Sequence, residues 1–214
     1  MKSIEGVGLA DMQAVYSGAE GDLWELIMGE QIHIGGFQSS MDLAERAGIG
    51  AGQHGVGLCC CNGAGMRFLV RFREDAWSYV GDKPKLIAEA VRIVKPGGTI
   101  AFTDWVEGPT GMSDGEAELF LQGMKFSNVQ DIDGYRNLLE KNGCAVIEAE
   151  DTGRFAPYMD LFLNMVEMQL TYDALRILNF NTEVLGAITT GFKFFQDLAR
   201  SGKLAQGRFI ARRQ

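Results

Sequence analysis

Residues 82–105 constrain the fold most strongly, because they join an amphipathic helix, an abrupt turn and an apolar strand. The stretch DKPKLIAEAVRIV (82–94) has a helical period, and its apolar face is formed by Leu86, Ile87, Ala90, Val91 and Val94. KPGG (95–98) follows, where the proline cannot continue a helix and the glycines can adopt positive φ. The run TIAFTDW (99–105) is then predicted to be a strand. A helix that reverses directly into a strand indicates an α/β sheet.

The same alternation continues along the chain. Helical patterns cover 3–30, 40–48, 131–144 and most of 158–200, and further strands are predicted at 56–61, 145–151 and 207–212. Ser40 is the predicted N-cap of the second of these helices, and Gly48 its C-terminal glycine. The sequence therefore predicts a single α/β domain over residues 1–214.

The composition of the chain argues against several classes of function. The 214 residues carry a formal net charge of −8, which disfavours an extended nucleic-acid interface. No apolar run is long enough to span a bilayer, and the N-terminal residues lack the pattern of a signal peptide. Three of the four cysteines are consecutive, Cys59 to Cys61, which indicates neither a disulfide framework nor a metal site. A reduced, cytoplasmic protein without membrane, nucleic-acid or metal partners is expected.

The segment VGLCCCNGAGM (56–66) is the first candidate site. It is predicted to be a strand, a glycine loop and the start of a helix, and cofactors bind at such junctions because backbone N–H groups point outward there. The same pattern also suits a purely structural turn.

Several motifs, in one order, resemble a known family. VGLCCCNGAG resembles the glycine motif of class I S-adenosylmethionine-dependent methyltransferases, and KPGGTIAFTD (95–104) resembles their helix–turn–strand signature. LWELIMGEQIHIGGF (23–37) and EDAWSYV (74–80) are similar to segments of the glycine, sarcosine and dimethylglycine N-methyltransferases, and GRFIARR (207–213) to the usual last strand. The resemblance implies a Rossmann-like methyltransferase sheet with helical segments over the substrate: a cap at 1–50 and coverings at 106–130 and 152–200.

The resemblance also implies site residues. Those expected at S-adenosylmethionine or S-adenosylhomocysteine are Tyr16, Trp24, His33, Cys60, Asn62, Gly63, Gly65, Asp75, Ala76 and Trp77, and those expected at the substrate are Trp105, Arg154 and Tyr158. No catalytic nucleophile is needed, because the sulfonium already activates the methyl group. Each residue also has a structural interpretation: core packing for the aromatic residues, a buried hydrogen-bonded imidazole for His33, and charge balance for Arg154.

Two departures from the family pattern stand out. Gly57 occupies the position of an acidic residue, and Cys59 and Cys61 replace two glycines. Between Arg71 and Glu74 the family places its second and third strands and most of its fourth, so the sheet is expected to be abbreviated. Either a homodimer completes its edge or the natural polypeptide carries additional residues there.

The predicted function is methyl transfer from S-adenosylmethionine to a small molecule, with an amine nitrogen favoured as acceptor. Three alternatives stay open: an oxygen or carbon acceptor, a non-catalytic binding protein on a decayed methyltransferase scaffold, and a nucleotide-dependent oxidoreductase. The chain lacks a G-x-G-x-x-G followed by an acidic residue, which argues against the last. The identity of the acceptor is not encoded in any motif.

Overall fold

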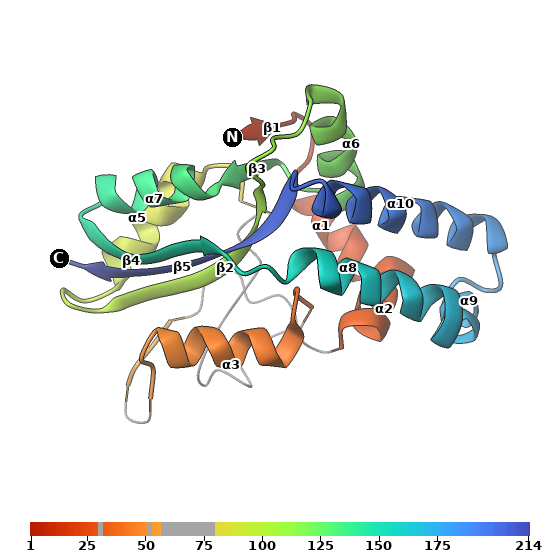
Figure 1. Cartoon of the computed structure of the whole chain (residues 1–214), viewed down its shortest axis with the longest axis horizontal. Helices are drawn as coiled ribbons and strands as arrows, with labels where there is room; N and C mark the ends of the chain where they lie inside the picture. The colour runs from red at the N-terminus through yellow and green to blue at the C-terminus, as the bar shows by residue number, and fades with distance from the viewer. Residues whose placement is uncertain (30–31, 51–52, 57–79) are drawn as a thin grey trace.

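A mixed sheet lies at the centre of the computed structural model, which describes residues 1–29, 32–50, 53–56 and 80–214 (Figure 1). In the described part of the chain the strand order is β1-β3-β2-β5-β4. The strands are β1 (Lys2–Ser3), β2 (Thr99–Glu107), β3 (Asn128–Asp131), β4 (Cys144–Asp151) and β5 (Leu204–Arg213). The sheet confirms the predicted α/β class.

The last strand, β5, runs antiparallel between β2 and β4. Its pairing with β2 is continuous from Thr99 opposite Arg212 to Glu107 opposite Leu204. Because β5 is antiparallel to both neighbours, β2 and β4 point the same way and end on the same side of the molecule (Figure 1). The short β3 pairs in parallel with the end of β2, and β1 pairs antiparallel with β3.

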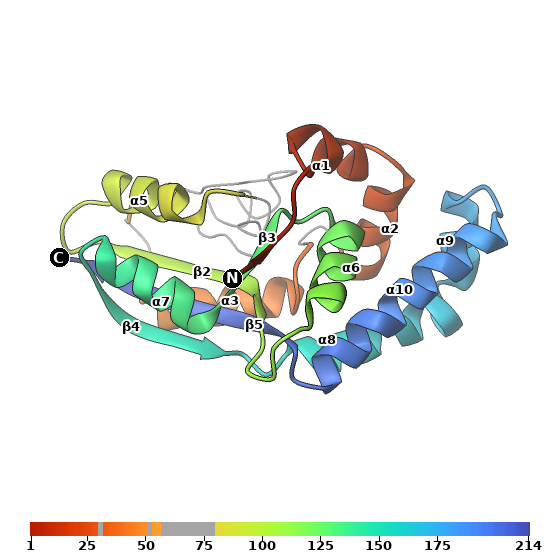
Figure 2. The same cartoon turned by 90° about the horizontal axis from the view of Figure 1, so that it is seen from above.

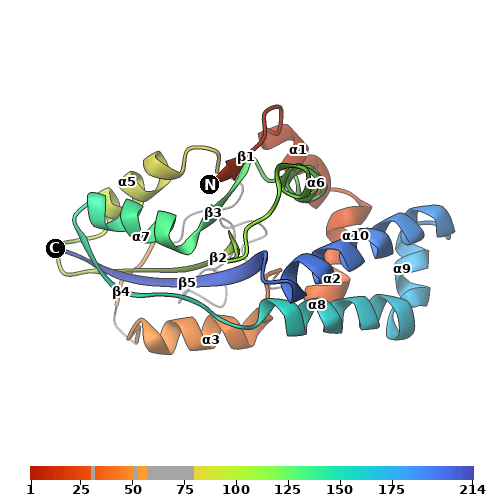
Figure 3. The ribbon, with the colours of Figure 1, turned by 45° about the horizontal axis from the view of Figure 1, so that its top comes forward.

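Helices cover both faces of the sheet. Figure 3 shows α5 (Lys83–Ile93) and α7 (Ile132–Lys141) on one face and α3 (Gly36–Arg46) on the other. The apolar core on the first face includes Ile87, Phe102, Tyr135, Leu139 and Phe209. On the opposite face, Leu43 of α3 and Ala47, the C-cap of this helix, pack against Ile210.

A helical lobe lies beyond the carboxyl ends of β2 and β4 (Figure 2). It contains α1 (Leu9–Tyr16), α2 (Ala19–Met28), α6 (Asp114–Met124), α8 (Phe155–Asn164), a π-helical stretch (Met165–Gln169), α9 (Thr171–Ile177) and α10 (Thr182–Arg200). Its apolar core joins the sheet through Trp105 and Leu204 and holds Ile34 from the turn before α3. The predicted N-terminal cap therefore divides: α2 packs in the lobe, whereas α3 lies on the sheet.

The predicted elements match the structure with some corrections. The helix expected at 40–48 begins at Gly36 with Gly35 as its N-cap, so the predicted cap at Ser40 is wrong. Ser40 is instead buried inside α3. Gly48 has a φ of +65°, which confirms it as the helix-ending glycine. The predicted strand at 56–61 lies outside the described residues except for Val56.

The KPGG turn uses its two glycines differently. Gly97 adopts a φ of +77°, as predicted, but no positive φ is found at Gly98. An ideal Cβ on Gly98 would lie 2.7 Å from Val94 Cγ1 and 2.9 Å from the Lys95 carbonyl oxygen. Gly97 therefore supplies backbone conformation, whereas Gly98 supplies close approach of the chain to itself.

We expect Gly97→Val to lower the free energy of unfolding by about 2 kcal/mol, because a β-branched residue is strained at positive φ. The space beside Gly97 is open, so no clash contributes. Gly97→Asn is the matched control, since asparagine tolerates this conformation better. Urea unfolding measures both variants, and equal stability of Gly97→Val and the wild type would contradict the strain.

Strand β4 contains a bulge that the predicted alternation missed. Its register with β5 shifts between Val146 and Glu148, and Ile147 is 60% exposed. Before the bulge, Cys144 and Val146 face the core under α5 and α7. After it, Glu148 and Glu150 lie opposite Ile210 and Arg208, on the face covered by α3. The bulge therefore turns both carboxylates away from the apolar core.

Candidate functional site

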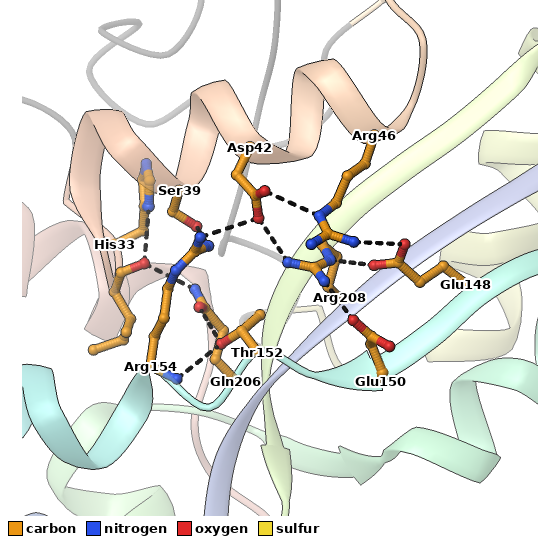
Figure 4. A network of polar contacts seen from close by, with 11 residues as sticks. His33, Ser39, Asp42, Arg46, Glu148, Glu150, Thr152, Arg154, Gln206 and Arg208 are labelled. Atoms are coloured by element: carbon orange, nitrogen blue, oxygen red, sulfur yellow. Dashed lines mark hydrogen bonds and ion pairs between the residues drawn. The ribbon is translucent and has the colours of Figure 1, made fainter.

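The candidate site lies where the carboxyl ends of β2 and β4 meet the turn before α3. Ligands of α/β sheets bind beyond the carboxyl ends of the strands, so a ligand is expected at this end of the sheet. Residues 152–154 lead from β4 into α8, and the turn at 33–36, here called the His33 turn, lies beside them (Figure 4).

The His33 turn is closed by its own backbone and fixed from α3. The Gly36 N–H donates to the His33 carbonyl at 3.0 Å, and Gly35 adopts a φ of +89°. The His33 Nε2 lies 3.1 Å from the Ser40 Oγ, and its Nδ1 lies 3.5 Å from the Ile34 carbonyl oxygen. Because a carbonyl only accepts, this pairing puts the imidazole proton on Nδ1 and leaves Nε2 to accept from Ser40.

His33 is uncharged at neutral pH. Burial, opposed by the hydrogen bond to Ile34 and aided by the positive charge of Arg154, lowers the pKa of His33 to about 4. The side chain is 7% exposed, so protonation places a charge where water cannot solvate it. The imidazole therefore adds no positive charge to this end of the sheet at neutral pH.

Because the pKa of His33 falls on folding, its contribution to stability is present above about pH 6.5 and is lost as the pH falls toward 4. We expect this group to remove about 2 kcal/mol of unfolding free energy between pH 7 and pH 5. His33→Gln keeps hydrogen-bonding capacity without titrating, so its stability should fall less over that range. Urea unfolding at a series of pH values makes the comparison, and parallel curves would contradict it.

A network of three arginines and three carboxylates anchors α3 to the sheet (Figure 4). Arg208 of β5 has a 5% exposed side chain and pairs with Asp42 of α3 at 2.7 Å. It also donates to Glu148 and Glu150 of β4. Arg46 adds a bridge from α3, to Asp42 at 2.9 Å and Glu148 at 3.4 Å.

Arg154, the predicted substrate arginine, belongs to the same network. Its guanidinium lies 3.0 Å from the Asp42 carboxylate and 3.4 Å from the Ser39 hydroxyl. Burial alone would raise the pKa of Asp42, but Arg46, Arg208 and Arg154 together lower it below its ordinary value. A substrate carboxylate at Arg154 must therefore compete with, or add to, an existing ion pair.

The predicted aromatic residues gather on the lobe side of the site. Trp105 is 4% exposed and packs its ring against Phe120, Phe126 and Phe155. Trp24 and Tyr158 lie half-buried at the edge of the same core, beside Phe192 and Phe162. Tyr16 is half-buried at the end of α1. The core thus brings Trp24, Trp105 and Tyr158 together with the His33 turn.

The remaining predicted cofactor residues lie outside the described part of the chain. They are Cys60, Asn62, Gly63, Gly65, Asp75, Ala76 and Trp77. Their assignment stays a prediction from the resemblance.

Four polar residues at this end of the sheet were not predicted: Asp42, Thr152, Gln206 and Arg208. A signal was present for two of them, because Gln206 and Arg208 interrupt the otherwise apolar last strand LAQGRFIA. In the described ranges no three His, Cys, Asp or Glu side chains are arranged so that they could hold a metal ion, and each helix there is too short or too polar to span a bilayer.

Comparison with known proteins bears on the fold. No family model matches the chain, and no curated protein matches it. Solved structures of S-adenosylmethionine-dependent methyltransferases do match, and the chain shares their fold, which confirms the predicted fold class.

One match extends along nearly the whole chain, to a phosphoethanolamine N-methyltransferase from Haemonchus contortus, solved with phosphomonomethylethanolamine and S-adenosylhomocysteine. Its TM-score is 0.78 at 15% identity, over 98% of this chain and 60% of that one. A putative sarcosine dimethylglycine methyltransferase from Galdieria sulphuraria matches 66% of this chain and 51% of its own, with a TM-score of 0.55 and 22% identity.

A cyclopropane synthase from Mycobacterium tuberculosis matches 69% of this chain and 57% of its own, with a TM-score of 0.56 and 15% identity. The chain thus spans between 51% and 60% of these three neighbours. That partial coverage is compatible with the block predicted to be missing between Arg71 and Glu74.

Proposed function

We propose that the chain binds S-adenosylmethionine and transfers its methyl group to a small molecule, with an amine nitrogen as acceptor. The observation that carries the proposal is the fold shared with a phosphoethanolamine N-methyltransferase along 98% of the chain. The sequences GEQIHIGGF and EDAWSYV, which resemble segments of amine methyltransferases, support it.

The charges of the described site fit a sulfonium. His33 is neutral at pH 7 because its pKa is about 4, and the positive charge of Arg154 is paired with Asp42. A cationic ligand at the carboxyl ends of the strands therefore meets a neutral imidazole and a guanidinium whose charge Asp42 partly offsets. When bound, the sulfonium supplies an activated methyl group, and the tasks left to the protein are to align the acceptor and exclude water.

Each segment has a place in this proposal. The glycine loop with Cys60, Asn62, Gly63 and Gly65, together with Asp75, Ala76 and Trp77, holds the cofactor, while Tyr16, Trp24 and His33 close over its methionine end. From the predicted cap at 1–50, the part that packs in the lobe covers the substrate, together with segments 106–130 and 152–200. Arg154, the N-cap of α8, and Tyr158 within α8 contact it, and Trp105 supports the start of that helix through its contact with Phe155.

A carbon acceptor is the second candidate, because a geranyl diphosphate C-methyltransferase from Streptomyces coelicolor is among the structural neighbours. A cytoplasmic location and a homodimer complete the proposal as predictions from the sequence.

Calorimetric titration of the folded protein with S-adenosylhomocysteine tests the proposal. We expect saturable binding that Gly63→Val weakens at least tenfold, since the resemblance assigns Gly63 to the loop whose backbone approaches the cofactor in the family. Gly143→Val is the matched control: Gly143 also needs its glycine, with a φ of +79°, but lies in the turn after α7. It should lower stability and leave the affinity unchanged.

A panel of amine, alcohol and carbon acceptors then identifies the reaction. Methylation of amines alone supports the nitrogen assignment, and methylation of carbon favours the second candidate. Binding without any product indicates the decayed scaffold, and a folded protein that binds no S-adenosylhomocysteine contradicts the methyltransferase proposal.

A further inference from the structure

A directional chain of hydrogen bonds links the end of β4 to the His33 turn. The Arg154 N–H donates to the Thr152 Oγ1 at 3.2 Å, and the Thr152 hydroxyl donates to the Gln206 Oε1 at 3.0 Å. The Gln206 Nε2 in turn donates to the Ile34 carbonyl oxygen at 3.0 Å. Figure 4 shows Thr152 and Arg154, from the segment between β4 and α8, close to Gln206 of β5.

Donor and acceptor roles in this chain are mutually consistent. The Thr152 hydroxyl receives one hydrogen bond and gives one, so its proton is directed at Gln206. The Gln206 carbonyl is thereby fixed toward Thr152, and its amide must face Ile34. Hydrogen bonds that run in one direction polarise and strengthen one another. A buried donor or acceptor that loses its partner costs free energy, because water cannot replace the lost bond.

Burial makes the arrangement rigid. Gln206 and Ile34 are both 0% exposed, so no water can replace the bond between them. Gln206 is anchored further through its backbone, since the Thr152 N–H donates to the Gln206 carbonyl oxygen at 2.9 Å. The backbone at Gly35 is also packed tightly against α3 and Arg154. A Cβ added to Gly35 would lie 2.8 Å from Ser39 Cβ and 3.4 Å from Arg154 Cδ.

We infer that Gln206 is a positioning residue, which holds the His33 turn at the carboxyl end of the sheet and so sets the affinity for the S-adenosyl ligand. The ligand part of this inference rests on the proposed function. Gln206 itself acts through the turn: its amide fixes the Ile34 carbonyl, and that carbonyl orients the neighbouring His33 imidazole.

Hydrogen exchange of the full chain, followed by mass spectrometry of peptides, tests the positioning without any ligand. Gln206→Met keeps the length of the side chain and removes its hydrogen bonds with Thr152 and Ile34, and Thr152→Val removes only the hydroxyl. In both variants we expect exchange in residues 32–41 to rise about fivefold to tenfold while β2 and β5 stay protected. Thr152→Ser should behave as the wild type.

Asn142→Leu is the matched control. It removes an amide bond to the Leu138 carbonyl oxygen, 2.8 Å long, at the end of α7 on the opposite face of the sheet. It should lower stability without selective exchange at 32–41. Unchanged exchange there in both Gln206→Met and Thr152→Val, or a rise equally shared by all peptides, would overturn the positioning role.

Titration with S-adenosylhomocysteine is the second readout. We expect Gln206→Met and Thr152→Val to weaken binding about fivefold to tenfold, because the bound position of the turn loses a buried hydrogen bond, and Thr152→Ser to retain it. Faster exchange at 32–41 with unchanged affinity overturns the link between the turn and the ligand. If the wild type binds no S-adenosylhomocysteine, both the proposed function and the effect of the turn on ligand affinity are contradicted. The exchange data still decide whether Gln206 holds the His33 turn.

Discussion

Arg208→Met is expected to lower the free energy of unfolding by about 3 kcal/mol, because it removes the cation that Asp42, Glu148 and Glu150 share. The arginine side chain is 5% exposed, and Glu148 is 18% exposed, so water cannot fully replace the lost guanidinium. Urea unfolding at pH 7 measures the loss. A change in the midpoint no larger than that of a surface variant would show that the network contributes little.

Arg92→Met supplies that surface reference. Arg92 also holds a carboxylate with two hydrogen bonds, to Glu89 at 2.6 and 2.8 Å, but both side chains are at least half-exposed. Exposed ion pairs of this kind contribute little, so its midpoint should barely move.

The contribution of this network of arginines and carboxylates to stability also depends on pH. Because the pKa of Asp42 is lowered on folding, its contribution is present above its unfolded pKa and is lost as the pH falls through the folded value. The difference in stability between the wild type and Arg208→Met should therefore shrink in acid.

Gly108→Ala is expected to lower the free energy of unfolding by about 3 kcal/mol. Gly108 directly follows β2, and its Cα lies against the backbone of the residues that precede β5. An ideal Cβ there would lie 2.9 Å from the carbonyl carbon of Gly202 and closer still to its oxygen. The two segments are joined by the bond from the Gly108 N–H to the Lys203 carbonyl oxygen, 2.8 Å long. They can separate only by straining this bond, and thermal unfolding measures the result.

Gly115→Ala is the matched control. Gly115 lies in α6 with nothing within 4 Å of the position that a Cβ would take and no positive φ, so alanine meets neither a clash nor strain. Alanine favours a helix over glycine, and a gain of about 0.5–1 kcal/mol is expected. A loss at Gly115, or none at Gly108, would contradict the steric explanation.

Much of the fold follows from local patterns. The amphipathic helix, the KPGG reversal and the apolar strands are predictable because each depends on residues adjacent in sequence. Helix α6 carries a usable signal, since Ser113 and Glu116 form a capping box, yet the sequence alone predicts 106–130 only as a covering segment. The predicted start of α3 is misplaced because Ser40 is a good cap in isolation, whereas the helix already begins at Gly36 and the Ser40 hydroxyl pairs with His33 instead.

The site is less predictable for a physical reason. His33 and Arg154 can be identified individually, but what they do is set by Ser40, Asp42 and Gln206, which come close only when the chain folds. The distance in sequence between Gln206 and Ile34 is 172 residues. No local pattern encodes such a contact, and a polar residue inside an apolar strand indicates only that some partner must exist.

At the bulge, β4 can lose a residue while the side chains before and after it stay on the same faces of the sheet. Val146 and Glu148 already lie opposite consecutive residues of β5, Ala211 and Ile210, so deletion of Ile147 would leave a regular ladder with both carboxylates still beside Arg208. Deletion of Ala149, after the bulge, would instead bring Glu150 opposite Phe209. The charge of Glu150 would then point into the apolar core beneath α7. Homologues of this chain should therefore gain or lose a residue at the bulge and keep a constant length from there to the end of the strand.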